Sequence, residues 1–220
     1  MAQANGSLKS HEAPDRYVGP LGRLKRAREA LGELVDGLRE DHAHIRRSEA
    51  KYGGRSISPE ELPADLVRKV GFQMMAGYRL MRLLSRAGVP LAPKIASRMI
   101  RHLYGSDIHW DAEFAPGVMI VHGMGLAISP AARVGHGAII FQHVTLGMGR
   151  HPDTQAVGAP TLEDNVHVGA GATLIGPITV GKGSKIMAGC VVVRSVPPHS
   201  IVEAPVPVVR SRLPRTDKTE

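Results

Sequence analysis

The sequence contains one cysteine, few aromatic residues and no long apolar run. Because Cys190 has no second cysteine to pair with, an internal disulfide is excluded, and we expect a reducing, cytoplasmic environment. Aromatic residues make up only 4% of the 220 residues, which disfavours a core built on large rings. No stretch approaches the roughly eighteen apolar residues of a membrane span, and none follows the first methionine, so we expect neither a membrane segment nor a signal peptide.

Charge is unevenly distributed along the chain. Residues 1–105 carry 19 Lys and Arg against 11 Asp and Glu, whereas residues 106–220 carry nine of each. A basic surface of this kind is compatible with nucleic acid, but no nucleic-acid-binding motif or aromatic interleaving accompanies it. We therefore expect solvated helix faces and no nucleic-acid partner.

Apolar side chains recur every sixth residue through the second half of the chain. From Ile108 the series continues, with two weak members, through Phe114, Ile120, Leu126, Ala132, Ala138 and Val144, and then through Leu162, Val168, Leu174, Val180, Ile186 and Val192. A period of six fits neither a helix nor a single strand. It fits a chain that turns a corner every six residues, so that three faces form a coil of about eighteen residues and the coils stack like paired strands. The alternative, a β-sandwich, has more variable strand lengths.

The preceding residues predict helices. Residues 21–50 carry an apolar stripe that includes Leu31 and Val35, and residues 64–87 carry one that includes Leu66, Val70, Met74, Tyr78, Met81 and Leu84. Ser58-Pro59 resembles a helix start, and residues 91–104 predict a shorter helix. We therefore expect a disordered segment over 1–17, a helical domain over 18–105, a coil domain over 106–200 and a loose tail over 201–220.

The repeats form two blocks, over residues 108–149 and 162–197. The segment between them is polar, contains glycine and proline, and lacks the inward apolar residue. Because Val144 and Leu162 are eighteen residues apart, the interruption leaves the phase of the repeat unchanged. We expect residues 150–160 to leave the coils as an extruded loop, the kind of segment that often carries function.

Histidines are concentrated in the repeat region, and His122 is the most suggestive of them. It lies in Val121-His122-Gly123-Met124-Gly125, where glycines allow another molecule to approach the backbone. Asp107 lies fifteen residues earlier, close to one full coil. A carboxylate beside an imidazole fixes its tautomer and stabilises the imidazolium, so the pair is a candidate for base catalysis. The competing interpretation is an exposed corner histidine.

A metal site is a rival use of these histidines. No pair has HxxxH or CxxC spacing, although His122, His143 and His167 have central positions, and stacked histidines from neighbouring subunits would suit zinc. We expect no metal.

Several motifs, in order and with similar spacing over about residues 64–200, resemble serine O-acetyltransferases. They are Gly71-Phe72-Gln73 with Tyr78-Arg79, Asp107-Ile108-His109, His122-Gly123, Val144-Thr145-Leu146-Gly147, Val168-Gly169-Ala170-Gly171-Ala172, Gly176-Pro177-Ile178 and Val196-Pro197-Pro198. The resemblance implies a mainly β protein with α-helices: a left-handed parallel β-helix preceded by an N-terminal α-helical domain. It also implies trimers, often paired into hexamers.

The resemblance further implies the chemistry and its residues. Acetyl-CoA would be the co-substrate, His122 the general base and Asp107 the carboxylate that orients it. Gly147, Ala170 and Lys185 would contact CoA, and Arg150, His151 and His143 would contact the acceptor. The leading acceptor is L-serine, and the alternative is another small hydroxyl compound. A non-catalytic or zinc-dependent β-helix, and a scaffold that binds partners through its basic helices, are further alternatives.

The sequence departs from the family at the acceptor side. Val121 stands where the family has an aspartate before the histidine, and Gly158-Ala159-Pro160 occupies the register of its Arg-His-Pro motif, while Arg150-His151-Pro152 occurs eight residues earlier. The chain ends in Glu220 instead of the isoleucine that docks into cysteine synthase, which counts against that partnership.

Overall fold

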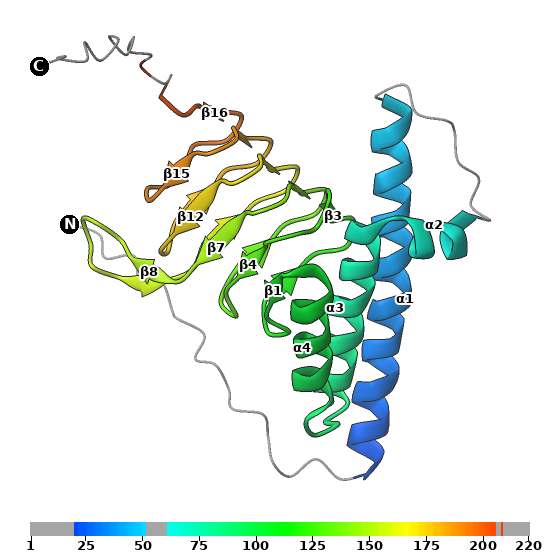
Figure 1. The fold of residues 1–220 in the computed structure, drawn as a ribbon. Coiled ribbons are helices and arrows are strands. Elements are labelled where there is room, and N and C mark those ends of the chain that lie inside the picture. Colours follow the sequence, from blue (N-terminus) through cyan, green and yellow to red (C-terminus); the bar gives the residue numbers. More distant parts are fainter. Residues whose placement is uncertain (1–19, 52–60, 206–207, 209–220) are drawn as a thin grey trace, which may run out of the picture.

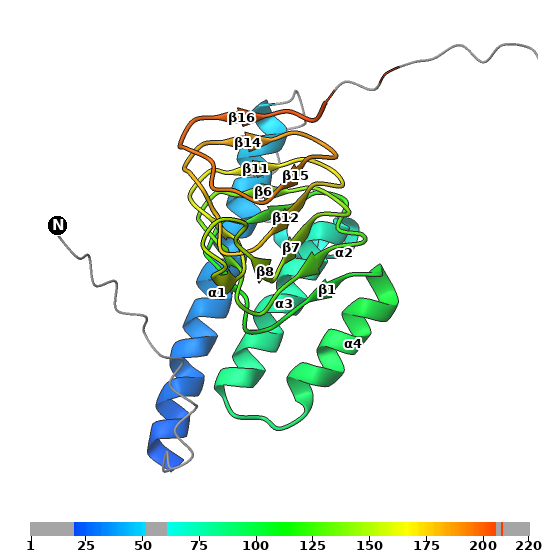
Figure 2. The same ribbon diagram turned by 90° about the vertical axis from the view of Figure 1, so that its left-hand side faces the viewer.

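In the part of the chain that the structure describes, four helices pack at the N-terminal end of a stack of β-coils. The computed structural model describes residues 20–51, 61–205 and 208. Figures 1 and 2 show the coils rising away from the helices, with the longest helix, α1, extending beside them. The predictions for residues 1–17, for a helix start at Ser58-Pro59 and for the end of the C-terminal tail fall outside the described residues.

The helices are α1 (Pro20–Lys51), α2 (Leu62–Arg68), α3 (Val70–Arg86) and α4 (Ala92–Tyr104). The helices predicted over 21–50 and 91–104 are confirmed. The single helix predicted over 64–87 is wrong, because Lys69 has extended backbone angles (φ −106°, ψ 104°) that separate α2 from α3. The break lets α3 take a new direction in which Gly71 lies directly against the backbone of Ile120.

The predicted apolar stripes are only partly buried. Met74, Tyr78 and Met81 are fully buried as expected, but Leu31 on α1 is 51% exposed and Val70 on α3 is 38% exposed. Leu66 and Val35 are exposed as well. The packed face of α1 instead contains Ala30, Gly37, Asp41, His42 and Ile45. Polar residues can occupy this face because they find buried partners, which a pattern of hydrophobicity does not register.

A buried ion pair joins the helices to the first coil. Asp41 accepts hydrogen bonds from Nε and Nη2 of Arg79 at 2.6 and 2.7 Å, and from the backbone N–H groups of Gly117 and Val118. Arg79 also donates to the carbonyl of Ala115. The neighbouring Tyr78 hydroxyl donates to the Ala112 carbonyl. The Tyr-Arg part of the sequence motif is therefore a docking element that fixes the coils on α3.

Short parallel strands form three faces of a triangular stack. The first face contains β1 (Asp107–Ile108), β4 (Ala127–Ile128), β7 (Thr145–Gly147), β12 (Thr173–Ile175) and β15 (Val191–Val192); the second contains β2 (Glu113–Phe114), β5 (Arg133–Val134), β10 (Thr161–Leu162) and β13 (Thr179–Val180); the third contains β3 (Met119–Ile120), β6 (Ile139–Ile140), β11 (His167–Val168), β14 (Lys185–Ile186) and β16 (Ile201–Val202). Within each face, neighbouring strands are parallel and lie one coil apart, so the fold is a parallel β-helix.

Two rows of side chains fill the interior of the stack. One row lies on the strands, and the other lies two residues before each strand residue, at the corners. The corner row is buried at Ala112, Val118, Leu126, Ala132, Ala138, Val144, Val166, Ala172, Ile178 and Cys190, and at Ser106 and Ser184. Ala132 and Ala138, the weak members of the predicted series, therefore belong to the corner row, which contains both small and large side chains.

The pairing register corrects the predicted phase. Ile108 pairs with Ile128, twenty residues on, whereas Ile128 pairs with Leu146, eighteen residues on. The first coil therefore contains two extra residues. Leu146 pairs with Leu174, twenty-eight residues on, so the interruption adds ten residues. Together the two insertions add twelve residues. Because twelve is a multiple of six, the spacing of apolar residues alone does not reveal either insertion.

The interruption between the two repeat blocks is a β-hairpin. Its strands are β8 (Gly149–Arg150) and β9 (Val157–Gly158), which pair antiparallel. Figure 1 shows the hairpin extending away from the coils. A Cβ atom on Gly149 would come within 2.3 Å of Ile175, so the base of the hairpin packs closely against the coil above it.

Candidate functional site

The two extra residues of the first coil lie at the corner that carries His122. This corner runs from Ile120 on β3 to Ile128 on β4, across Val121-His122-Gly123-Met124-Gly125. The Gly123 N–H donates to the carbonyl of Val121 at 2.8 Å, and His122 between them has φ +64°. An i to i+2 hydrogen bond around a residue of positive φ is a γ-turn of the rare, strained kind. The turn presents His122 as an exposed side chain.

Left-handed backbone alone does not distinguish His122 from other corner residues. His143, Asn165 and His199 also have φ near +56°, at corners without an insertion. Histidine and asparagine are among the residues that tolerate this region best, so the corners select for them. What distinguishes His122 is the combination of the γ-turn and the two-residue insertion.

The His122 loop is held from below by α3 and by Ser106. A Cβ atom on Gly123 would lie 2.5 Å from Sδ of the fully buried Met74, and Gly123 has φ +66°, so no other residue fits without strain. The buried Ser106 hydroxyl donates to the Gly123 carbonyl at 2.9 Å and accepts from the Leu126 N–H at 3.0 Å. The loop is therefore a fixed part of the fold.

Asp107 lies beside this loop but does not contact His122. Its carboxylate pairs with Nη2 of Arg101 at 2.6 Å, and both side chains are at least half exposed. Because the coil has twenty residues, Asp107 lies in register with Ala127, and the expected contact with the imidazole is not formed. Within residues 20–51 and 61–205, no hydrogen bond or ion pair joins His122 to another side chain.

The other predicted residues of this corner lie above His122. The imidazole of His143 packs against Gly125: a Cβ atom built on Gly125 would lie 2.1 Å from the His143 Nδ1. The backbone N–H of His143 donates to the Met124 carbonyl. One coil higher, Gly171 donates to the carbonyl of Gln142, which places Ala170 over the same corner. His122, His143 and Ala170 therefore form one column.

An apolar depression lies beside the upper part of this column. It has a volume of about 300 Å³ and is lined by Phe141, His167, Ala170, Lys185 and Met187 among others. His167 and Lys185 are in register on β11 and β14. The structure thus brings together two of the three predicted CoA contacts, Ala170 and Lys185, at a surface that combines apolar walls with one cation.

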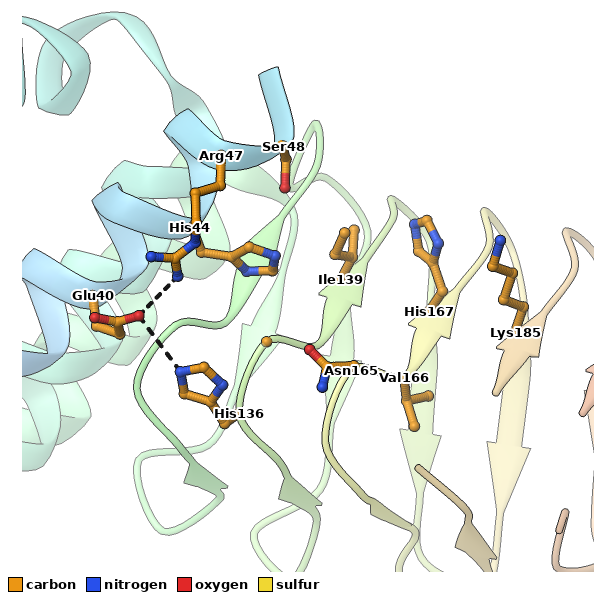
Figure 3. Close-up of a pocket in the computed structure, with 11 residues that line it drawn as sticks. Glu40, His44, Arg47, Ser48, His136, Ile139, Asn165, Val166, His167 and Lys185 are labelled. Carbon is orange, nitrogen blue, oxygen red and sulfur yellow. Dashed lines mark hydrogen bonds and ion pairs between the residues drawn. The ribbon is translucent and has the colours of Figure 1, made fainter. Parts of the chain in front are cut away.

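A more polar groove of about 670 Å³ separates α1 from the third face of the stack. Figure 3 shows Glu40 between Arg47 and His136, which it contacts at 2.8 and 3.5 Å. Arg47 lowers the pKa of Glu40, whereas burial lowers the pKa of His44, whose Nδ1 donates to the Gly117 carbonyl. The charges near α1 are therefore mutually paired, and Lys185 contributes the cation at the opposite side of the groove.

The remaining predicted residues lie at a different corner. Gly147 ends β7, and Arg150 and His151 follow it into the hairpin, so all three lie where the first face turns into the second. Arg150 is exposed. The Nδ1 atom of His151 accepts from the N–H groups of Asp153 and Thr154, at 3.2 and 3.4 Å, and so supports the turn of the hairpin. Within one protomer the hairpin and His122 belong to opposite edges of the same face.

Three residues of this region were not found from the sequence. Arg101 and Phe141 carry no local signal, because their importance depends on Asp107 and on the depression. Ser106 does carry one: it is a polar residue in the corner row, two positions before Ile108. Recognition of that second row, which the count of every sixth residue missed, would have identified it.

Comparisons with known proteins match this chain to hexapeptide-repeat transferases and to serine acetyltransferases. A family profile described as bacterial transferase hexapeptide (six repeats) matches residues 159–194. A serine acetyltransferase of Salmonella typhimurium is 34% identical over 214 residues, which covers 97% of this chain and 77% of that protein. One from Synechococcus elongatus is 41% identical over 128 residues, 58% of this chain and 51% of that protein.

Solved structures give the same result. The crystal structure of a Neisseria gonorrhoeae serine acetyltransferase in complex with serine has a TM-score of 0.67 and 27% identity, and the match covers 85% of this chain and 76% of that one. The predicted fold class, a left-handed parallel β-helix preceded by α-helices, is confirmed by this likeness.

The chain spans only 51–60% of the length of several curated relatives that it matches. In the part of the chain that the structure describes, no helix is long and apolar enough to cross a membrane. In that same part, no group of three or more His, Cys, Asp or Glu side chains is arranged to hold a metal ion.

Proposed function

Since this chain belongs to the serine acetyltransferase family, we propose that it transfers the acetyl group of acetyl-CoA to the hydroxyl of a small acceptor, with L-serine the leading candidate. The observation that carries the proposal is the two-residue insertion at His122. Within the first repeat block, the regular coil is broken only at the corner that presents this exposed imidazole on a strained turn, and strain of this kind clusters at functional sites.

The proposed reaction is a direct transfer within a ternary complex. Neutral His122 accepts the hydroxyl proton of the acceptor as its oxygen attacks the thioester carbonyl carbon. The carbon–sulfur bond then breaks, and His122 returns the proton to the CoA sulfur, so an ester and a free thiol form and the enzyme is regenerated.

We retain Asp107 as the carboxylate that orients the imidazole. Its present partner, Arg101, is more than half exposed, and exposed ion pairs contribute little free energy. The carboxylate is therefore free to turn toward the imidazole when the acceptor and thioester bind. Catalytic hydrogen bonds often form only in the substrate complex.

We propose that the complete site lies between two copies of the chain. His122, His143 and Ala170 occupy one edge of the first face, whereas Gly147, Arg150 and His151 occupy its other edge. A trimer of prisms, or a pair of trimers, would bring the hairpin of one protomer to the His122 corner of the next. Residues 106–200 would then carry the chemistry, and residues 18–105 would serve assembly and the acceptor side.

The CoA contacts are assigned to Gly147, Ala170 and Lys185. Ala170 and Lys185 line the same apolar depression, which suits a thin pantetheine arm, and the Lys185 ammonium suits a phosphate. The amino-acid acceptor is supported by the serine complex of the Neisseria gonorrhoeae relative. Val121 offers no charge to an amino group, so a related hydroxyl compound is the alternative acceptor. The single Cys190 is consistent with a cytoplasmic reaction.

The test is thiol release from acetyl-CoA in the presence of L-serine, homoserine and other hydroxyl compounds. We expect His122→Asn to lower kcat by a factor on the order of 10² or more, because it removes the general base. Asparagine tolerates a positive φ, so the turn should persist. The matched control is His199→Asn, since His199 is another exposed corner histidine of positive φ (+56°). Near-normal turnover of His122→Asn would rule out the assignment.

A further inference from the structure

Two serines interrupt the otherwise apolar corner row of the coils. Ser106 and Ser184 are both 0% exposed, and every other buried member of that row among the described residues is apolar. A buried hydroxyl is costly unless it is hydrogen-bonded, so each must have a partner within the stack. Both do, and both bond to backbone atoms of the corner one coil further along the chain.

Ser106 bonds to both ends of the segment that departs from the regular coil. Its Oγ donates to the Gly123 carbonyl at 2.9 Å and accepts from the Leu126 N–H at 3.0 Å. Gly123 directly follows His122 in the γ-turn, and Leu126 is the residue at which the regular path resumes. The hydroxyl thus supplies, for the inserted residues, backbone partners that a regular coil would have provided.

The backbone next to Ser106 makes the same connection. The N–H of Asp107 donates to the Leu126 carbonyl at 2.7 Å. The consecutive residues Ser106 and Asp107 therefore attach the His122 loop to the strand that carries the orienting carboxylate. Above the loop, the Met124 carbonyl accepts from His143. The position of His122 relative to Asp107 is set by these few bonds.

We propose that Ser106 is a positioning residue for catalysis: its buried hydroxyl holds the γ-turn that presents His122 at a fixed distance from Asp107. The inference rests on the proposed function, because it assumes that His122 is the base. Ser106 touches neither acceptor nor thioester and acts through the backbone of the loop. Its effect should therefore fall on the chemical step and leave acetyl-CoA binding nearly unchanged.

Ser184 provides a matched control. Its Oγ donates to the Pro197 carbonyl at 2.8 Å and accepts from the Ser200 N–H at 3.1 Å, in a corner away from His122 and Asp107. Because Ser184 directly precedes Lys185, a proposed CoA contact, the two variants are compared through kcat. Ser184→Ala removes the same two kinds of bond between coils as Ser106→Ala, from an equally buried position, and Ser106 has in addition a longer contact with the Tyr104 carbonyl at 3.3 Å. Any general cost of losing a buried hydroxyl is common to the two variants.

The experiment measures kcat, the KM for acetyl-CoA and the unfolding midpoint of both variants. We expect the unfolding midpoint to fall by similar amounts in the two variants. Only Ser106→Ala should show a lower kcat, by about tenfold, and both KM values should stay within about twofold of the wild type, because a displaced base slows chemistry more than binding. Equal kcat for the two variants, or a Ser106→Ala kcat within about twofold of the wild type, would overturn the proposal. If Ser106→Ala does not fold, Ser106→Cys, which is similar in size and a weak hydrogen-bonding group, takes its place.

Amide hydrogen exchange separates this inference from the proposed function. Ser106→Ala should speed exchange at Leu126, and Ser184→Ala should speed exchange at Ser200, whether or not the protein transfers acetyl groups. If Leu126 exchanges at its wild-type rate in Ser106→Ala, the hydroxyl does not hold the loop and the inference fails. If exchange responds but His122→Asn retains full turnover, the proposed function fails and the role of Ser106 in the loop remains.

Discussion

Histidines in this protein serve different purposes that composition does not separate. His143 and His199 fill corners of positive φ, His151 supports the turn of the hairpin, and His44 ties α1 to the first coil through the Gly117 carbonyl. His122 alone of these lies on the γ-turn of the two-residue insertion. A histidine in the sequence is therefore only a candidate. The backbone around it distinguishes a structural imidazole from one that is available for chemistry.

His44 provides a prediction about pH. Burial lowers its pKa below the value of about 6.5 that applies in the unfolded chain, although its bond to Gly117 acts in the other direction. As pH falls below about 6.5, the unfolded state therefore binds a proton before the folded state does, and stability is lost. The groups that face His44 are Arg47 and His136, which oppose its charge, and Asp41, which favours it.

We expect His44→Gln to reduce this loss, because glutamine retains a donor for Gly117 and does not titrate. Urea unfolding at pH 7.5 and pH 5.5 tests it: the wild type should lose more free energy of unfolding between the two values than the variant. Equal losses would show that other groups govern the acid side of the stability curve.

Close packing between α3 and the first coil fixes the floor of the site. A Cβ atom on Gly71 would lie 1.9 Å from the backbone oxygen of Ile120, and one on Gly123 would lie 2.5 Å from Met74 of the same helix. Two glycines, one on each element, thus allow a helix to approach a strand and a turn at backbone distance. The chain leaves α2 at Lys69 and begins α3 at Val70, directly before the residue that makes this contact.

We expect Gly71→Ala to lower the free energy of unfolding by about 1–3 kcal/mol, because the added methyl group meets backbone atoms that cannot move aside independently. The matched control is Gly32→Ala in the exposed part of α1, where nothing lies within 4 Å of the new atom. That variant should gain up to about 1 kcal/mol from helix propensity. Chemical denaturation of both variants measures the difference, and similar values for the two would contradict the proposed contact.

At the scale of elements, the six-residue spacing predicts the correct fold class but, between Leu126 and Val144, selects residues of the corner row instead of the strand row. Six-residue spacing indicated a β-helix because one side chain per face must point inward. It could not reveal the two insertions, at His122 and at the hairpin, because together they add a whole number of six-residue repeats and the spacing on either side stays in step. The helix breaks and buried polar faces depended on tertiary contacts such as Asp41 with Arg79, which no local pattern contains.

For the whole molecule, the separation of the predicted residues across one face has a testable consequence. If His122 of one protomer acts with Arg150 and His151 of another, two inactive variants should complement each other. Co-refolding His122→Asn with an Arg150→Ala, His151→Ala double variant at equal amounts should restore about a quarter of the wild-type sites. Half of the protomers supply an intact His122 and half supply an intact hairpin, so about a quarter of the interfaces combine both.

The control is each variant refolded alone, which should remain inactive. Thiol release by the mixed preparation is the readout. An inactive mixture that nevertheless forms mixed oligomers would show that all of these residues act within one protomer, or that the hairpin takes no part in the reaction.

The sequence by itself determined the architecture and the chemical candidates, because side-chain period, corner glycines and the motif order are local properties that survive any error in phase. Only the tertiary structure decided which residues share an edge, that Asp107 pairs with Arg101, and that a buried serine holds the His122 turn. Those facts depend on distances between coils, and such distances follow from register and insertions that spacing along the chain leaves undetermined.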